Sequence, residues 1–424
     1  MKLLKRINRQ QFAFAFCCLL LVALIYSKFL ISVSMIALLV IAVFHLDFNK
    51  NFPIGINPSL KSNFLKLLSH KAYLACSLFF IIVLLSGLWS EDTDYLLERL
   101  RIKLPFLLLP FAIISIPNFS ERHYLSLFYF LVVLMFISSS LVGMNYFLNF
   151  EAITEAISRG KNIPTPMHHI RFSLMLAFSV LAGFVLWWKK FYLKYKWESN
   201  FIALITIFLF YFIHVLSVRS GLFVLYLSIL FFSLRHIYLT RHYKLGVAAI
   251  LAVIFLPVIA YHTIQSFQAK VDYARRDMQM YYLGQGKDYS DAERIISYEV
   301  GLKIGNKNPL FGVGAGDLKK EVEAYYEEQF IDTSAPKMPH NQFISTYAGM
   351  GIFGLIFFCA AFFYPLLYRK NYKDSLFASF HFIVFLSFMV ENTIETSIGV
   401  AFYSFFLLVG LNYLNGKEND LEKI

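Results

Sequence analysis

A small set of ionisable residues interrupts a chain that is otherwise mostly apolar. Three of them could do chemistry together: Arg219, Arg294 and His340. A guanidinium stays charged and can bind a phosphate through two parallel hydrogen bonds, even where water is scarce. A neutral imidazole can accept a proton near pH 7. Two arginines and a histidine that faced one cavity would therefore suit a pyrophosphate substrate and a proton to be removed.

Each of the three residues also has a purely structural explanation. Arg219 lies in a short break between two apolar runs, where an arginine can anchor a hairpin by reaching to the membrane surface. Arg294 could be a solvated residue of a loop helix. His340 could be a hydrogen-bonded histidine at the membrane interface. Asn341 follows it and is a good N-cap, so the positive end of the next helix would favour a neutral His340.

Further polar residues could assist. Glu391 could pair with an arginine or orient His340, or be an ordinary carboxylate of a short loop. In the run His168-His169-Ile170-Arg171, we expect Arg171 to be a further phosphate contact. We expect His169 and Asn341 also to bind or orient the substrate. Adjacent histidines point apart on a helix, and no ligand follows at the next turn, so we expect no metal. The chain has no Walker A sequence, so we do not expect ATP to be the energy source. We expect no cofactor either.

Composition bounds the class of protein. The chain has 424 residues, of which 58% are hydrophobic and only 16% are charged, which indicates an all-α polytopic membrane protein. The basic residues that give the chain its net charge of +12 lie in short loops between apolar runs and do not cluster on one soluble surface. We therefore do not expect nucleic-acid binding. The four cysteines lie inside apolar runs and indicate neither a disulfide framework nor a zinc site.

Apolar runs long enough to cross a membrane need about 20 residues each. About twelve such runs are predicted by this measure. They cover residues 11–27, 29–46, 72–89, 101–117, 124–148, 171–188, 201–218, 220–238, 245–262, 342–368, 375–390 and 397–414. Lysine and arginine gather in alternate connections, which predicts that both termini are cytoplasmic.

This topology divides the chain into spans 1–262, a long outer loop 263–341 and spans 342–424 with a tail. It puts His168, His169, Arg171, Arg219, His340, Asn341 and Glu391 at outer ends of spans, and it puts Arg294 in the outer loop. Ionisable groups at membrane depth are costly and are usually functional, so their common side predicts one outward-facing site.

The long loop has its own local signals. Ser290-Asp291-Ala292-Glu293 has the form of a capping box, which predicts a helix that Gly305 and Asn306 end. A compact turn follows at residues 309–316, and Asp317 is expected to cap a helix over 318–329. The glycine run 312–316 lacks the preceding strand that a dinucleotide loop needs.

Four stretches resemble the O-antigen ligase and polymerase superfamily, whose members are bacterial membrane glycosyltransferases that use polyprenyl-diphosphate-linked glycans. Asn308-Pro309-Leu310-Phe311-Gly312-Val313-Gly314 resembles the family's "NPLFGxG" turn. Pro339-His340-Asn341, followed by Gly349-Met350-Gly351-Ile352-Phe353-Gly354, resembles its "HN…GxxG" stretch. Arg219-Ser220-Gly221 resembles its Arg-Ser/Thr-x turn, and Asp291-Ala292-Glu293-Arg294 resembles its loop arginine. The resemblance in the overall arrangement of spans and loop covers nearly the whole chain.

The resemblance implies an inverting, metal-independent transfer on the periplasmic face of the inner membrane. Arg219 and Arg294 would hold the diphosphate, and His340 would help to activate the acceptor hydroxyl. Glu391 matches a position where the ligases commonly have an acidic residue. The donor would be a glycan on undecaprenyl diphosphate. Membrane lipids would surround the protein. The single late loop favours a ligase, with lipid A–core as the acceptor.

Other functions stay open. A polymerase would extend another lipid-linked repeat, and a protein O-oligosaccharyltransferase would use protein hydroxyls. A transporter or flippase of lipid-linked glycans would use the arginines as a transit site, but the sequence lacks the paired helix breaks that many transporters have.

Overall fold

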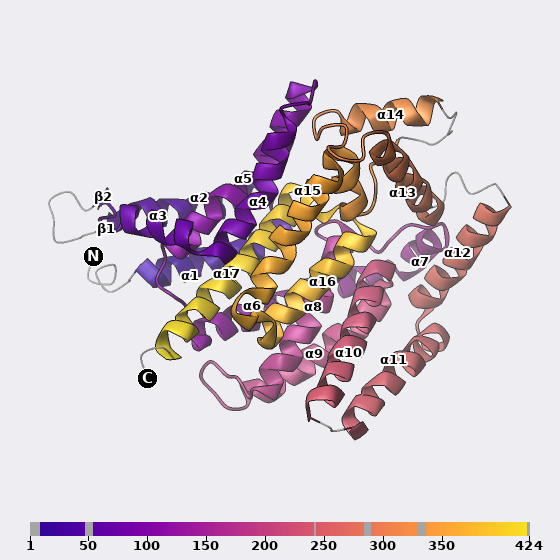
Figure 1. Cartoon of the computed structure of the whole chain (residues 1–424). Coiled ribbons are helices and arrows are strands. Elements are labelled where there is room, and N and C mark those ends of the chain that lie inside the picture. The colour runs from indigo at the N-terminus through magenta and orange to yellow at the C-terminus, as the bar shows by residue number, and fades with distance from the viewer. Residues whose placement is uncertain (1–8, 47–53, 241–242, 284–289, 329–335, 422–424) are drawn as a thin grey trace. The chain divides into compact units, whose positions relative to one another are not determined.

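The computed structural model describes residues 9–46, 54–240, 243–283, 290–328 and 336–421 (Figure 1). These residues are almost entirely helical, which confirms the prediction of an all-α polytopic protein. One two-stranded antiparallel sheet is described: β1 (Phe44–Leu46) pairs with β2 (Ile54–Ile56), with Phe44 opposite Ile56.

The chain divides into two compact units. Unit 1 comprises residues 1–127, 297–378 and 391–424, and unit 2 comprises residues 128–296 and 379–390. Unit 1 contains α1 (Arg9–Tyr26), α2 (Lys28–Val43), α3 (Leu60–Ser69), α4 (Lys71–Ser86), α5 (Thr93–Ile114), α14 (Leu318–Glu328), α15 (Gln342–Leu367), η2 (Tyr368–Lys373), η3 (Thr393–Glu395) and α17 (Ser397–Leu421). Unit 2 contains α7 (Phe150–Ser158), α8 (His169–Trp188), α9 (Glu198–Leu216), α10 (Arg219–Thr240), α11 (Tyr243–Thr263) and α12 (Gln265–Tyr282). Three helices run from one unit into the other: α6 (Glu121–Leu148), α13 (Ser290–Lys307) and α16 (Ser375–Val390).

Each of the twelve predicted spans corresponds to a helix. Among the described residues, eight helices are by themselves long and apolar enough to cross a membrane: α1, α6, α8, α9, α10, α11, α15 and α17. A ninth results if α3 and α4, which meet at an 84° bend, form one span. The remaining three are α2 and α16, which are apolar but shorter, and α5, which carries several charged residues.

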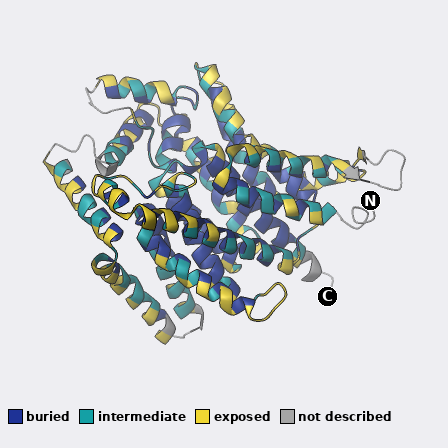
Figure 2. Ribbon diagram, turned by 180° about the vertical axis from the view of Figure 1, so that it is seen from behind, coloured by how far each residue is buried: buried dark blue, intermediate teal, exposed yellow. Residues whose placement is uncertain are grey.

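The core of unit 1 is an aromatic cluster where four helices meet. Phe79 of α4 has its ring 5.0 Å from Phe106 of α5, 5.3 Å from Phe358 of α15 and 5.4 Å from Tyr403 of α17. Of the apolar window of α17, 94% is buried. Figure 2 colours each described residue by its burial, with buried residues in dark blue. Close aromatic packing of this kind fixes the helices that carry the polar residues described below.

Helix α15 is interrupted at Gly351, and a turn distant in sequence binds the backbone on both sides of the interruption. Gly351 has φ +64° and ψ −167°, a conformation that only glycine adopts readily. The N–H groups of Val313 and Gly314 donate to Ala348 and Gly349, while those of Ile352 and Phe353 donate to Pro309 and Leu310. The turn over 308–314 therefore holds both halves of α15 by their backbones.

The glycines of this turn are needed for close approach. A Cβ on Gly312, which has φ +70°, would lie 2.4 Å from the backbone N of Met350. A Cβ on Gly351 would lie 2.3 Å from the backbone of Leu310. The two glycine motifs of the sequence thus form one contact between two backbones.

In unit 2, α8 packs against α9 and α10. Gly221, near the start of α10, is so close to α8 that a Cβ there would lie 2.5 Å from the Cβ of Ser173. The chain reverses between α9 and α10 at Ser217, which has φ +55°. The starts of α8 and α10 therefore lie together.

Candidate active site

His340 and Glu391 face one another in unit 1. Nδ1 of His340 lies 3.6 Å from Oε1 of Glu391, and their side chains are 28% and 17% exposed. This Nδ1 atom is itself buried and has no hydrogen-bond partner, because Glu391 lies slightly too far away for a hydrogen bond. The exposed part of the side chain is thus on the rest of the ring, which includes Nε2. A carboxylate beside Nδ1 favours the proton on that nitrogen and leaves the Nε2 lone pair free to accept one.

The segment that carries His340 is fixed from both sides. The backbone N–H of His340 donates to Oγ of Ser297 at 3.1 Å. The Asn341 side chain accepts from the N–H groups of Phe343 and Ile344 at 2.9 and 3.1 Å, which confirms it as the N-cap of α15.

Part of the long loop packs onto the start of α15. Gly301 of α13 lies against Pro339 and Ile344, where an added Cβ would approach their side chains to 2.7 and 2.6 Å. One turn further, Gly305 lies against the ring of Tyr347, whose hydroxyl donates to Asn306. Small residues four apart let this part of α13 lie close to α15.

Gln342 ties the His340 segment to the Glu391 segment. Its amide nitrogen donates to Oε1 of Glu395 at 2.8 Å, and its amide oxygen accepts from the N–H of Ile394 at 3.0 Å. The side chain is fully buried. The two hydrogen bonds of this one amide thus join Gln342, two residues after His340, to Ile394 and Glu395, which follow Glu391 in the chain.

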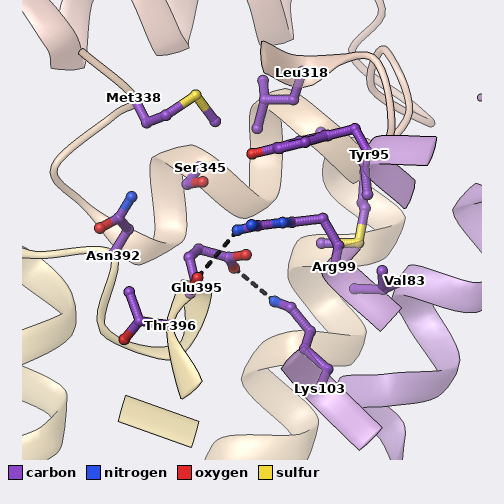
Figure 3. A pocket seen from close by; sticks show the side chains of 13 residues that line it. Val83, Tyr95, Arg99, Lys103, Leu318, Met338, Ser345, Asn392, Glu395 and Thr396 are labelled. Atoms are coloured by element: carbon purple, nitrogen blue, oxygen red, sulfur yellow. Dashed lines mark hydrogen bonds and ion pairs between the residues drawn. The ribbon is translucent and has the colours of Figure 1, made fainter. Parts of the chain in front are cut away.

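A small pocket of about 120 Å³ lies beside these segments (Figure 3). Its polar lining includes Tyr95, Arg99 and Lys103 of α5, Asn392 and Glu395. Tyr95 and Arg99 extend from α5 toward Ser345 of α15. The lining reaches Met338, two residues before His340, and Asn392, which follows Glu391.

The floor of the pocket is a buried ion pair. Nζ of Lys103 lies 2.6 Å from Oε1 of Glu395, and Lys103 is 3% exposed. Nη1 of Arg99 donates to the backbone oxygen of Glu395 at 3.1 Å. Burial alone would raise the pKa of the Glu395 carboxyl, but Lys103, the Gln342 amide and Arg99 together hold that pKa below its usual value.

Arg171, Arg219 and Arg294 lie in unit 2, whereas His340, Asn341 and Glu391 lie in unit 1. Arg219 is the first residue of α10 and Arg171 the third of α8, each two residues ahead of the contact between Gly221 and Ser173. The structure therefore brings the helix starts that carry these two arginines together. Arg171, Arg219 and Arg294 are all half-buried.

His169 is the first residue of α8, and its ring lies 4.4 Å from that of His168. Within the described residues, no three His, Cys, Asp or Glu side chains are placed to hold a metal ion. The sequence-based view of Arg171 and His169 as substrate contacts stays a prediction.

Three local predictions for the long loop meet different outcomes. The helix expected after Asp317 is α14, but the Asp317 carboxylate accepts from the N–H groups of Glu91 and Asp92, at 2.8 and 2.7 Å, and so joins α14 to the start of α5. Helix α13 continues through Gly305 and Asn306 to Lys307, since packing on Tyr347 outweighs the low helix propensity of glycine. The side chains of Ser290 and Asp291 lie outside the described part, so the capping box stays a prediction.

Sequence reasoning missed Arg99, Lys103 and Gln342 as parts of this region. Arg99 and Lys103 are four residues apart, so they share a helix face, and Lys103 lies in an otherwise apolar stretch. That spacing was a usable signal, whereas nothing in the sequence marks Gln342.

A comparison with protein families provides the remaining observation. The family model described as O-Antigen ligase matches residues 204–359. This match supports membership of the O-antigen ligase superfamily, as the motifs had indicated. Residues 204–359 are the part of the chain that is similar to this family. It contains Arg219, Arg294 and His340, the 308–314 turn and the break in α15, whereas Arg171, His169 and Glu391 lie outside it. A comparison with curated proteins finds no match.

Proposed function

We propose that this O-antigen ligase family protein is a glycosyltransferase that moves a glycan from undecaprenyl diphosphate to the lipid A–core. In this proposal the enzyme works on the periplasmic face of the bacterial inner membrane, and both termini are cytoplasmic. The observation that carries the proposal is the His340–Glu391 pair in the segment that follows the long loop. A histidine oriented by a carboxylate is suited to activating a hydroxyl.

The proposed reaction has one displacement step. Nε2 of His340 takes the proton of an acceptor hydroxyl as that oxygen attacks the anomeric carbon of the donor glycan. The bond between this carbon and the diphosphate oxygen breaks on the opposite face, so the anomeric configuration inverts. Undecaprenyl diphosphate leaves with the electron pair of that bond.

Arg219 and Arg294 are proposed to hold the diphosphate, with Arg171 and His169 as further contacts. Guanidinium groups bind phosphate oxygens in pairs and stabilise charge that develops on a leaving group. The proximity of the starts of α8 and α10 supports a joint role for Arg171 and Arg219. The proposal requires these arginines and His340 to act on one substrate.

The pocket lined by Tyr95, Arg99 and Asn392 is proposed to hold part of the acceptor glycan. Its lining continues to residues beside His340 and Glu391, so a sugar there would present a hydroxyl to the pair. Aromatic, guanidinium and amide groups together offer a stacking face and hydrogen-bond donors to a sugar.

The test uses purified protein in detergent with a polyprenyl-diphosphate glycan, with and without lipid A–core, and products are resolved by gel and mass spectrometry. Glycan on lipid A–core, made only by active protein, supports the ligase. A longer glycan still on polyprenyl diphosphate contradicts it in favour of a polymerase. Transfer to protein hydroxyls alone indicates a protein O-oligosaccharyltransferase, and no transfer with any acceptor favours a transporter.

A further inference from the structure

The connection between α8 and α9 forms a pocket that the transfer reaction does not use. This pocket in unit 2 has a volume of about 650 Å³. Its lining residues are Trp187, Trp188, Lys190, Tyr192, Lys196, Ser199 and Asn200. The pocket therefore combines two lysines and three aromatic side chains in one concave surface at the ends of two membrane helices.

The connection has a fixed backbone. The Glu198 carboxylate accepts hydrogen bonds from the N–H groups of Leu193, Lys194 and Tyr195, at 2.7, 3.1 and 2.9 Å. At the end of α8, Lys190 adopts φ +51° and its N–H donates to Trp187. Glu198 therefore holds the loop in shape, and it does not line the pocket. The side chains that line the pocket remain available to a ligand.

The charge of the connection is strongly positive. It carries four lysines, Lys189, Lys190, Lys194 and Lys196. Glu198, the carboxylate that follows them in sequence, is buried and accepts hydrogen bonds from backbone N–H groups. Only Lys190 and Lys196 line the pocket. An anion in the pocket would meet two ammonium groups without a competing carboxylate in its lining.

The aromatic side chains indicate what kind of anion fits. Trp187 and Trp188 are 42% and 60% exposed at the last turn of α8, where a helix leaves the membrane. Tryptophan prefers this level because its ring is amphipathic. A free phosphate would use the lysines alone, whereas a phospholipid would also cover the indole rings with its glycerol backbone and acyl chains.

We infer that the pocket between α8 and α9 binds the phosphate headgroup of an anionic phospholipid through Lys190 and Lys196, with Trp187 and Trp188 against its apolar part. Basic pockets between membrane helices bind acidic headgroups in this way. The inference is independent of the transfer reaction and of the arginines proposed to hold the diphosphate.

Two double variants with the same charge change test it. Lys190→Gln/Lys196→Gln removes the lysines that line the pocket, and Lys189→Gln/Lys194→Gln removes two lysines of the same loop outside it. The detergent-purified proteins are titrated with phosphatidylglycerol or phosphatidylcholine, and bound lipid is counted by native mass spectrometry. We expect the first variant to bind phosphatidylglycerol about tenfold more weakly or worse, and the second to bind like wild type.

Folding and the source of the phosphate are controlled separately. Lys190→Arg/Lys196→Arg keeps both charges and should retain binding, which separates a lost ligand contact from a damaged loop. Equal losses in the two glutamine variants, unchanged binding in both, or equal binding of the two lipids would overturn the inference. So would inorganic phosphate displacing the lipid at equal concentration, because the ligand would then be a free anion.

Discussion

Residues around His340 and residues around Arg219 are held in different ways. In unit 1, α15 and the residues just before it are joined to three distant segments. Residues 348–353 bind the 308–314 turn through backbone hydrogen bonds, His340 binds Ser297 of α13, and Gln342 binds η3. In unit 2, Arg171 and Arg219 occupy the first turns of two helices that pack closely through Gly221. The first region fixes the backbone around His340 at several points, whereas the second carries two arginines at the starts of closely packed helices.

This difference fits two kinds of work. A general base must be placed within hydrogen-bond reach of the proton that it takes, so its support should be rigid. Cationic side chains that hold a diphosphate can follow their ligand as it leaves. Substitutions in the first region should therefore affect folding or the rate of transfer, and those in the second should affect donor binding as well.

The largest effect is expected where two backbones touch. Gly351→Ala requires an alanine at φ +64° and places Cβ 2.3 Å from Leu310, so we expect a cost of a few kcal/mol from a total stability of about 5–15 kcal/mol. Gly349→Ala is the matched control, since its Cβ would have no neighbour closer than 3.5 Å. Recovery of folded protein after detergent extraction measures the stability of both variants. Equal recovery would contradict the account in which the 308–314 turn holds α15 together at its break.

The next effect concerns the arginines of unit 2. Arg294→Lys keeps the charge but loses the paired donors of the guanidinium, so we expect kcat/KM for the donor to fall about a hundredfold, with a clear rise in KM. Arg219→Lys should behave alike. Arg159→Lys is the control, because Arg159 is exposed and pairs with Glu155 of α7, the helix that it follows. Unchanged donor affinity and rate in Arg294→Lys would remove Arg294 from the diphosphate site.

Gln342 is a positioning residue, and its substitution should lower the rate without changing donor affinity. Gln342→Glu places a second carboxylate at the 2.8 Å contact with Glu395, so we expect kcat to fall about tenfold at pH 7. Two close carboxylates share a proton at lower pH, which restores a donor toward Glu395.

Activity of Gln342→Glu relative to wild type should therefore rise as the pH falls from 7 to about 5. Gln342→Leu cannot recover in this way and serves as the control. A relative activity that is flat with pH in both variants would mean that Gln342 does no more than fill space.

The smallest effect on activity is expected at Glu395, which should matter mainly for stability. Its pKa is held below the ordinary value of 4.5, so the pair with Lys103 stabilises the fold above that pH and stops doing so as the pH falls through the lowered pKa. Glu395→Gln should lower the melting temperature by about 5 °C at pH 7, and the difference from wild type should shrink as the pH falls below the ordinary value of 4.5. A difference independent of pH would contradict this account.

The fold could largely be predicted from hydropathy, because apolar runs of about 20 residues leave few alternatives to membrane helices. Each predicted run is a helix, and Asn341 caps α15 as its position before an apolar run indicated. Arg101 and Lys103 obscure the start of the span in α5, and only the partner Glu395, distant in sequence, explains a buried lysine there.

Tertiary contacts account for what the sequence could not reveal. Asp317 has the right place for an N-cap, yet the backbone of Glu91 and Asp92 competes for its carboxylate. The glycines of 308–314 and 349–354 were visible as motifs, but their contact with each other depends on a break in α15 that no local propensity predicts. Whether Arg219, Arg294 and His340 act on one substrate stays a prediction.

The central claim is that His340 removes the acceptor proton, and single-turnover transfer by His340→Ala tests it most directly. The measurement compares the rate of glycan transfer and the affinity for the polyprenyl-diphosphate donor, with His123→Ala as the control because His123 contacts only Ser120 and neighbouring aromatic rings in the described structure. We predict a rate about 100 to 10,000 times lower with donor affinity unchanged. Transfer at the wild-type rate would contradict the account.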